Sequence, residues 1–319
     1  MFEVLGITGP IFILIGLGFV AVRSGLIGIE QVRGMGTFVI YFALPALLFN
    51  ALSQRDFDEV MNVSYLSAYA LASLAVFGSG LLLASRLRGQ GLSASAVLAM
   101  GMAVPNSGFV GYPIAVMVMG NTAALGMALG MLVENLLLLP LALALAEAGQ
   151  QRGEGWRVAR ETGLRLLRNP LIIAISLGLA SSVSGWHLPA LPQRVIDMLV
   201  GASAPVALFV IGGSLAAALA AQRPQGMLAD VLQTSLGKLV LHPAALALSY
   251  LVFTDIDPLL MVTGLLFAAA PVMTVYPILG QRYGLEQRCA AALVANMVLA
   301  FFSLNALLAL LRWQGLLPS

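Results

Sequence analysis

Long apolar runs recur along the whole of this 319-residue chain and constrain its fold more than any other feature. An α-helix needs about 20 consecutive apolar residues to cross a hydrocarbon core of about 30 Å. Charged residues make up only 9% of the chain, against about 25% in typical soluble domains, so they cannot cover a soluble globule of this size. The sequence therefore predicts an all-α integral membrane protein that lies in a lipid bilayer.

The apolar runs define ten predicted transmembrane helices joined by short connections. The expected spans are residues 4–22, 34–53, 63–85, 92–118, 122–147, 169–185, 195–221, 231–253, 258–281 and 287–311. The longest polar stretch, 148–168, separates residues 1–147 from residues 169–319, and each of these parts carries five spans. We therefore expect two five-helix units joined by a cytoplasmic linker.

The arginines are distributed very unevenly between the two sides of the membrane. Twelve of them follow odd-numbered spans, whereas only Arg55, Arg194 and Arg312 fall on the opposite side. Positively charged connections stay in the cytoplasm. This distribution predicts that both the N-terminus and the C-terminus lie outside the cytoplasm.

The remaining composition argues against several classes of function. A net charge of +2 gives no signature of polyanion binding, so we expect no nucleic-acid partner. Cys289 is the single cysteine, and the two histidines, His187 and His242, are far apart in the sequence. Clustered metal ligands are therefore missing from the pattern, and we expect neither a metal nor a cofactor.

Two pairs of similar segments suggest an internal repeat. Residues 44–49 (LPALLF) resemble residues 204–209 (APVALF), at an offset of 160 positions. The Pro and Tyr-Pro pattern of 105–113 is repeated in 271–277, about 165 positions further on. Five spans separate each pair, so the two halves are predicted to insert with opposite orientation, as in many secondary transporters. The alternative is chance similarity between proline-rich apolar segments.

Spans 4 and 9 carry prolines and small polar residues near their middles, which predicts two broken helices. Such breaks are tolerated in lipid only where protein or a water-filled cavity satisfies the freed backbone groups. Two broken helices that cross at the midplane present half-helix N-termini, whose free N–H groups suit an anion. The residues expected to bind it are Pro105, Asn106, Ser107, Gly108, Pro271, Met273 and Thr274, with Asn50 of span 2. The alternative is a pair of proline-kinked helices that hold no ligand.

Three ionisable residues lie at membrane depth, namely Glu134 in span 5 and the pair Lys238 and His242 in span 8. Charges at this depth are costly and mark functional sites by default. Desolvation disfavours the charged form of a carboxylate, so Glu134 is expected to exchange a proton, with Lys238 or His242 as its charge partner. Alternatively, Lys238 snorkels to the interface and His242 is a packed neutral residue. Asn135 and Asn296 are expected to be supporting polar residues.

Together these motifs resemble the auxin efflux carrier family. The resemblance rests on residues 105–113, 44–49, 238–243 and 270–271, in this order within a ten-span layout. The family pattern Asn-x-Gly-x-x-Gly-x-Pro corresponds here to Asn106, Gly108, Gly111 and Pro113. The family's crossover asparagine maps onto Asn106, whereas the second crossover departs from an asparagine and carries Met273 and Thr274.

The resemblance implies a crossover fold like that of bile acid:sodium symporters, with a dimeric scaffold and an elevator-type transport unit. Spans 1, 2, 6 and 7 would form the scaffold, and spans 3–5 and 8–10 would form the transport unit. Family members from bacteria resemble permeases for small organic anions such as malonate or malate. The chain is therefore expected to be a short bacterial form in the inner membrane.

The leading interpretation is a proton-coupled secondary transporter of a small carboxylate, and not an enzyme. Within the same class, sodium-coupled symport and passive transport of organic anions or amino acids remain open. A channel and a membrane-embedded enzyme are the alternatives from other classes. The enzyme lacks support because no acidic cluster faces the cytoplasmic side.

Overall fold

The computed structural model describes residues 2–55, 62–150, 168–220 and 227–317. Throughout these ranges the regular structure is helical, and the only strand-like pairing is a single antiparallel bridge between Pro105 and Val272. Most of the expected 148–168 linker lies outside the described residues. The expected all-α fold is confirmed for the parts that the structure describes.

Six helical stretches are long and apolar enough to cross a membrane. They correspond to the second, third, fifth, seventh, eighth and tenth expected spans. The stretches are Ile29–Ser53, Val63–Leu87, Thr122–Ala148, Ala190–Ala217 within α12 (Ala190–Ala220), Leu228–Ser249, and α17 (Glu286–Trp313). The predicted total of ten spans therefore stays a prediction.

The remaining helices, apart from α1, are shorter, and their lengths show where the chain breaks. These helices are α1 (Phe2–Arg23), α6 (Leu92–Ala103), α7 (Tyr112–Met119), α11 (Pro170–Ser184), α15 (Pro258–Ala269) and α16 (Tyr276–Gln281). The fourth expected span is interrupted between α6 and α7, and the ninth is interrupted between α15 and α16. Both interruptions contain a proline, so the predicted breaks of these two helices are confirmed.

Most of the long stretches contain a wide π-helical turn, as does the segment before α7, and prolines explain the position of four of these five turns. The segments are α2 (Ile29–Phe38), η1 (Val39–Ala43) and α3 (Leu44–Ser53); α5 (Val63–Leu82) and η2 (Leu83–Leu87); η3 (Ser107–Gly111) before α7; α8 (Thr122–Val133), η4 (Glu134–Leu138) and α9 (Leu139–Ala148); and α13 (Leu228–Leu236), η5 (Gly237–Leu241) and α14 (His242–Ser249). Pro45, Pro113, Pro140 and Pro243 each stand at the second residue after a π turn. A proline ring clashes with the carbonyl four residues earlier, and the wider turn makes room for it.

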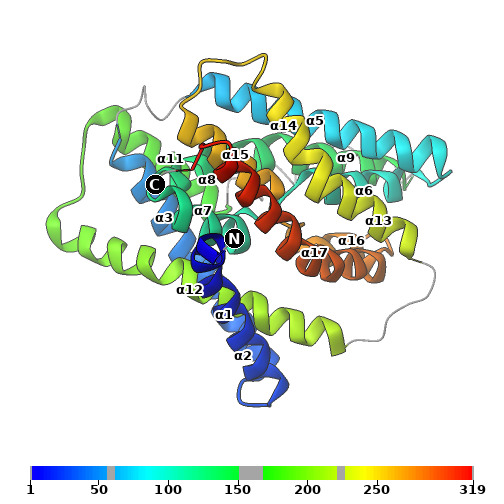
Figure 1. The fold of residues 1–319 in the computed structure, drawn as a ribbon, viewed down its shortest axis with the longest axis horizontal. Helices are drawn as coiled ribbons and strands as arrows, with labels where there is room; N and C mark the ends of the chain where they lie inside the picture. Colours follow the sequence, from blue (N-terminus) through cyan, green and yellow to red (C-terminus); the bar gives the residue numbers. More distant parts are fainter. Residues whose placement is uncertain (1, 56–61, 151–167, 221–226, 318–319) are drawn as a thin grey trace.

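The helices pack into two sets, and in Figure 1 α1, α2 and α12 of the first set lie below α5, α6, α13 and α14 of the second. In the first set, α12 packs along α1, α2 and α3, and α11 packs against α3. In the second set, α5 packs against α6 and α14, α17 packs against α13 and α16, and α8 packs against α15. The helices α3 and α8 touch across the boundary, as do α7 and α12.

Glycines allow the closest approach within the first set. Gly18 of α1 faces the Phe209 carbonyl of α12, and Gly212 of α12 faces the Ile15 carbonyl of α1. A Cβ atom at either glycine would overlap the facing backbone. The two helices therefore pack backbone against backbone, as is common where small residues line a membrane helix interface.

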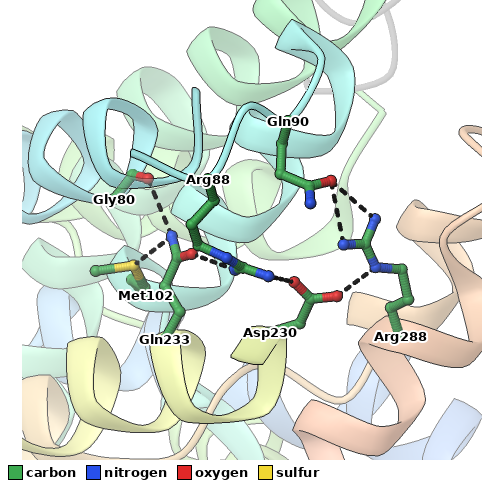
Figure 2. A network of polar contacts seen from close by, with 7 residues as sticks. All are labelled: Gly80, Arg88, Gln90, Met102, Asp230, Gln233 and Arg288. Carbon is green, nitrogen blue, oxygen red and sulfur yellow. Dashed lines mark hydrogen bonds and ion pairs between the residues drawn. The ribbon is translucent and has the colours of Figure 1, made fainter. Parts of the chain in front are cut away.

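A buried carboxylate ties three helices of the second set together (Figure 2). Asp230 of α13 is only 2% exposed and accepts hydrogen bonds from Arg88, just after η2, at 2.5 Å and from Nε of Arg288 of α17. Arg88 also donates to Gln233 at 2.6 Å, and the Arg288 guanidinium donates to Gln90 at 3.2 Å. This network joins α13 and α17 to the polar end of the α5–η2 stretch.

Candidate functional site

The two breaks cross each other and are joined through their backbones. The N–H of Asn106 donates to the carbonyl of Pro271 at 2.7 Å, beside the bridge between Pro105 and Val272. Pro105 and Pro271 have no N–H of their own, so the helices before them end there. Residues 168 positions apart, Asn106 and Thr274, thereby come into contact.

The Asn106 side chain lies at the centre of the crossing. Its amide nitrogen donates to Oγ1 of Thr274 at 2.6 Å, and its amide oxygen accepts from the N–H of Phe109 at 3.3 Å. Asn106 therefore caps the N-terminus of η3 and joins it to the second break. The residue is only 4% exposed. The sequence predicted that the two broken helices cross near Asn106 and Thr274, and the structure brings these two residues together.

A cavity of about 450 Å³ lies against the crossing. Its walls come from the two breaks, η1, the η4–α9 stretch and the start of α11. Of the expected site residues, it is lined by Pro105, Asn106, Ser107, Gly108, Glu134, Asn135, Met273 and Thr274. The volume is in the range of small-molecule sites. Eight of the predicted residues thus surround one space.

Glu134 forms the acidic side of this cavity. It is 4% exposed, and its Oε1 atom accepts hydrogen bonds from Oγ of Ser107 at 2.7 Å and from the hydroxyl of Tyr69 at 3.0 Å. Oε2 accepts no hydrogen bond from the residues that the structure describes. One carboxylate oxygen is thus held by hydroxyls, while the other is available to a proton or a ligand.

Lys238 lies behind the cavity and is fully buried. Its ammonium donates to the carbonyl of Ala268 at 2.5 Å and is 2.9 Å from Nδ1 of His242. Snorkelling to the membrane surface, the alternative for Lys238, is therefore wrong. The Ala268 carbonyl is at the C-terminal end of half-helix α15, where a cation is favoured by the helix dipole.

His242 connects Lys238 to Glu134 through an aromatic neighbour. The Nε2 atom of His242 is 2.9 Å from Oγ of Ser73, and its ring meets the ring of Tyr69 edge-on, with centroids 5.9 Å apart. Because Tyr69 also donates to Glu134, the acid and the two basic residues belong to one buried polar cluster. Neither Lys238 nor His242 lines the cavity itself.

The other predicted polar residues are more scattered. Asn135 lines the cavity, and its side chain donates to the Met131 carbonyl of its own helix at 2.9 Å. Asn296 donates to Oγ of Ser235 at 3.0 Å and lies away from the cavity. Asn50 lines a separate polar cavity of about 330 Å³ and accepts from Gln193 at 2.7 Å.

Pro271 contributes through its backbone. Its carbonyl accepts from Asn106, while its ring lines an apolar pocket between α1 and α17 and not the main cavity. The structure thus places Pro271 at the crossing but keeps its side chain out of the candidate site.

Sequence reasoning missed two residues of this region, Tyr69 and Arg168. Tyr69 is fully buried and is one of two tyrosines four positions apart in the third span, a spacing that the apolar pattern gave no reason to single out. Arg168, one of the twelve arginines predicted to lie on the cytoplasmic side, lines the main cavity just before α11. The available signal for Arg168 was its position directly before Asn169 and Pro170, which are the N-cap and the first residue of a helix.

Comparison with known proteins shows the family of the chain. Residues 8–308 match the family model described as membrane transport protein. A protein of Rhizobium meliloti whose provisional name is malonate transporter is 30% identical over the whole of this chain and 99% of its own length. The chain is also 25% identical to an uncharacterized transporter of Methanothermobacter thermautotrophicus, over 64% of this chain and 66% of the relative. The uncharacterized transporter YfdV of Escherichia coli is 22% identical, over 75% of this chain and 76% of its own.

Proposed function

The chain belongs to the membrane transport protein family that includes the auxin efflux carriers, and from this premise we propose that it is a secondary active transporter of small organic anions. Dicarboxylates such as malonate or malate are the proposed substrates, in line with the name of the Rhizobium meliloti relative. The observation that carries the proposal is the cavity that joins the crossing of the two broken helices to a buried glutamate.

The crossing offers neutral donors that suit a carboxylate. Ser107 and Gly108 begin the η3–α7 helix, and their N–H groups precede its first intrahelical hydrogen bonds. Both residues line the cavity, and the positive end of the helix dipole points the same way. Asn106 and Thr274 add side-chain donors beside them. The first carboxylate of the substrate would bind here.

Glu134 is the proposed coupling residue, because it shares the cavity with the bound anion. An ionised Glu134 and a carboxylate substrate repel each other at close range in a site of low dielectric. Protonation of Glu134 removes this repulsion, so proton binding and anion binding favour each other. Ser107 connects the two events, since its hydroxyl donates to Glu134 while its backbone lies at the anion site.

Transport is proposed to follow an elevator movement of the second helix set against the first. The scaffold would contain α1, α2, α3, α11 and α12 and would form a homodimer in the bacterial inner membrane. Ten spans in two inverted repeats, with both termini outside, fit this arrangement. The contacts of Glu134 with Tyr69 and of Asn296 with Ser235 support the repeat. The first pair joins the third and fifth spans and the second joins the eighth and tenth, so the two pairs correspond at an offset of about 160 positions.

Uptake of labelled malonate and malate into proteoliposomes tests the proposal, with and without an imposed proton gradient. The wild-type protein should accumulate substrate only with the gradient. Glu134→Gln should lose gradient-driven accumulation but retain exchange of substrate across the membrane. Glu147→Gln is the matched control, because Glu147 follows on the same α8–α9 stretch, is equally buried at 4% exposed, and pairs with Arg282 away from the cavity.

Two results would contradict the proposal. Failure of the wild-type protein to move either acid would remove the carboxylate substrate, and gradient-driven accumulation by Glu134→Gln would remove this residue from coupling. A sodium gradient without a proton gradient is the arm that tests the second candidate, sodium symport. Glu134 is the only carboxylate among the described lining residues, which favours protons over a sodium site built from several oxygens.

A further inference from the structure

One charged side chain of the main cavity has no part in the mechanism proposed above. Among the lining residues that the structure describes, Arg168 is the only one with a cationic side chain. It lies just before α11, which packs against α3 and η1 of the first helix set, whereas the crossing and Glu134 belong to the second set. The cavity is therefore lined by a cationic residue from the first set and by neutral donors from the second.

The Arg168 guanidinium is available to a ligand. Its side chain is exposed, and it makes no ion pair with any residue in the described part of the chain. Glu134, the acidic residue that lines the same cavity, already accepts hydrogen bonds from Ser107 and Tyr69. A guanidinium presents a planar fork of N–H donors that matches a carboxylate with two parallel hydrogen bonds.

The charges of the cavity favour a ligand with two carboxylates. The crossing supplies neutral donors for one carboxylate, and an additional negative charge beside Glu134 needs a positive partner. Arg168 provides this charge from the first helix set. Resting on the function proposed above, we propose that Arg168 binds the second carboxylate of a short dicarboxylate whose first carboxylate is held at the crossing, so that Arg168 selects dianions over monoanions.

This assignment places the substrate between the two helix sets. One end contacts Asn106 and Thr274, which belong to the broken helices, and the other contacts Arg168 on the first set. A monoanion of the same shape would bind the crossing alone. The discrimination between the two ligands therefore depends on one residue that takes no part in the crossing.

Ligand binding to the purified full-length protein in lipid nanodiscs tests the proposal directly. The probes are malonate and malonamate, which share a carbon skeleton but differ in that malonamate replaces one carboxylate with a neutral amide. The variants are Arg168→Gln, Arg168→Lys and, as a control, Arg33→Gln. Arg33 is an exposed arginine that pairs with Glu30 three residues earlier, away from the cavity.

We expect the wild-type protein and Arg33→Gln to prefer malonate. Arg168→Gln should weaken malonate binding by about 10- to 100-fold, as for the loss of a hydrogen bond to a charged group, and leave malonamate binding unchanged. Arg168→Lys should be intermediate, since it keeps the charge and loses the fork. Unchanged malonamate binding also shows that the variant is folded.

The outcomes separate this inference from the function on which it rests. An unchanged ratio of malonate to malonamate affinity in Arg168→Gln overturns the role of Arg168, even where the wild-type protein binds malonate. Equal loss of both ligands overturns it as well, because a structural defect does not distinguish them. Binding of neither probe by the wild-type protein overturns the carboxylate site itself. Loss of proton coupling in the uptake experiment leaves the role of Arg168 intact.

Discussion

Asp230→Asn is the substitution whose effect on stability can be worked out most directly from the structure. The Asp230 carboxylate is 2% exposed and accepts hydrogen bonds from two arginines, Arg88 and Arg288, as Figure 2 shows. The asparagine has the same size but no charge. Its amide nitrogen would face one of the two guanidinium groups, donor against donor. One hydrogen bond is therefore lost, and two positive charges remain side by side.

The magnitude follows from the burial of the partners. Removal of one member of a buried ion pair costs about 3–5 kcal/mol, because the other charge stays buried and unpaired. Here the side chains of Arg88 and Arg288 are 21% and 24% exposed, so water compensates part of the loss. We therefore expect the low end of this range, about 3 kcal/mol.

Thermal unfolding of the protein in detergent measures the effect. A loss of about 3 kcal/mol lowers the midpoint by about 6 °C, at about 2 °C per kcal/mol for a chain of this length. Glu30→Gln is the control, because the Glu30–Arg33 pair has side chains 77% and 70% exposed and contributes about 0–1 kcal/mol. Equal midpoints for the two variants would refute the reasoning that burial decides the strength of these ion pairs.

Two further predictions concern packing and charge within the second helix set. Gly126→Ala should destabilise the protein by about 1–3 kcal/mol, because its Cβ would overlap the γ2 methyl of Thr263, whereas Gly130→Ala, with its nearest neighbour 3.6 Å away, should leave the unfolding midpoint nearly unchanged. Equal effects of the two alanines would contradict the glycine contact between α8 and α15. Lys238→Met should cost about 2 kcal/mol, because the buried Ala268 carbonyl loses its donor. An unchanged midpoint for this variant would mean that another donor reaches the carbonyl.

The parts of the site that could be predicted from the sequence are those set by local chemistry. Pro105 and Pro271 cannot donate a backbone hydrogen bond, so their helices had to break wherever the rest of the chain placed them. Asn106, Ser107 and Thr274 stand next to these breaks, which was enough to expect them at one crossing. Most of the six long spans follow equally simply from runs of apolar residues.

The parts that could not be predicted depend on which helix faces which. The contact of Tyr69 with Glu134 joins helices 65 positions apart, and nothing in either local pattern indicates it. Arg168 lines the cavity only because packing against α3 and η1 brings the start of α11 to it. Asn50 is a polar residue in an apolar span, as Asn106 is, yet it lines a different cavity. One sequence gives composition and spacing, whereas the rotation of each helix is decided by packing.

Proline chemistry nevertheless determines part of that rotation. In η4, the N–H of Leu139, just before Pro140, bonds to the carbonyl of Glu134, five residues earlier. The same pattern occurs in η3 and η5, which hold Ser107 and Lys238. One extra residue in a turn rotates the helix on one side by about 100° relative to the other. The polar face that contains Glu134 can therefore point toward the cavity while the rest of the helix keeps the apolar packing of a membrane span. In this fold, prolines a few residues after the polar side chains set the angle at which the site is presented.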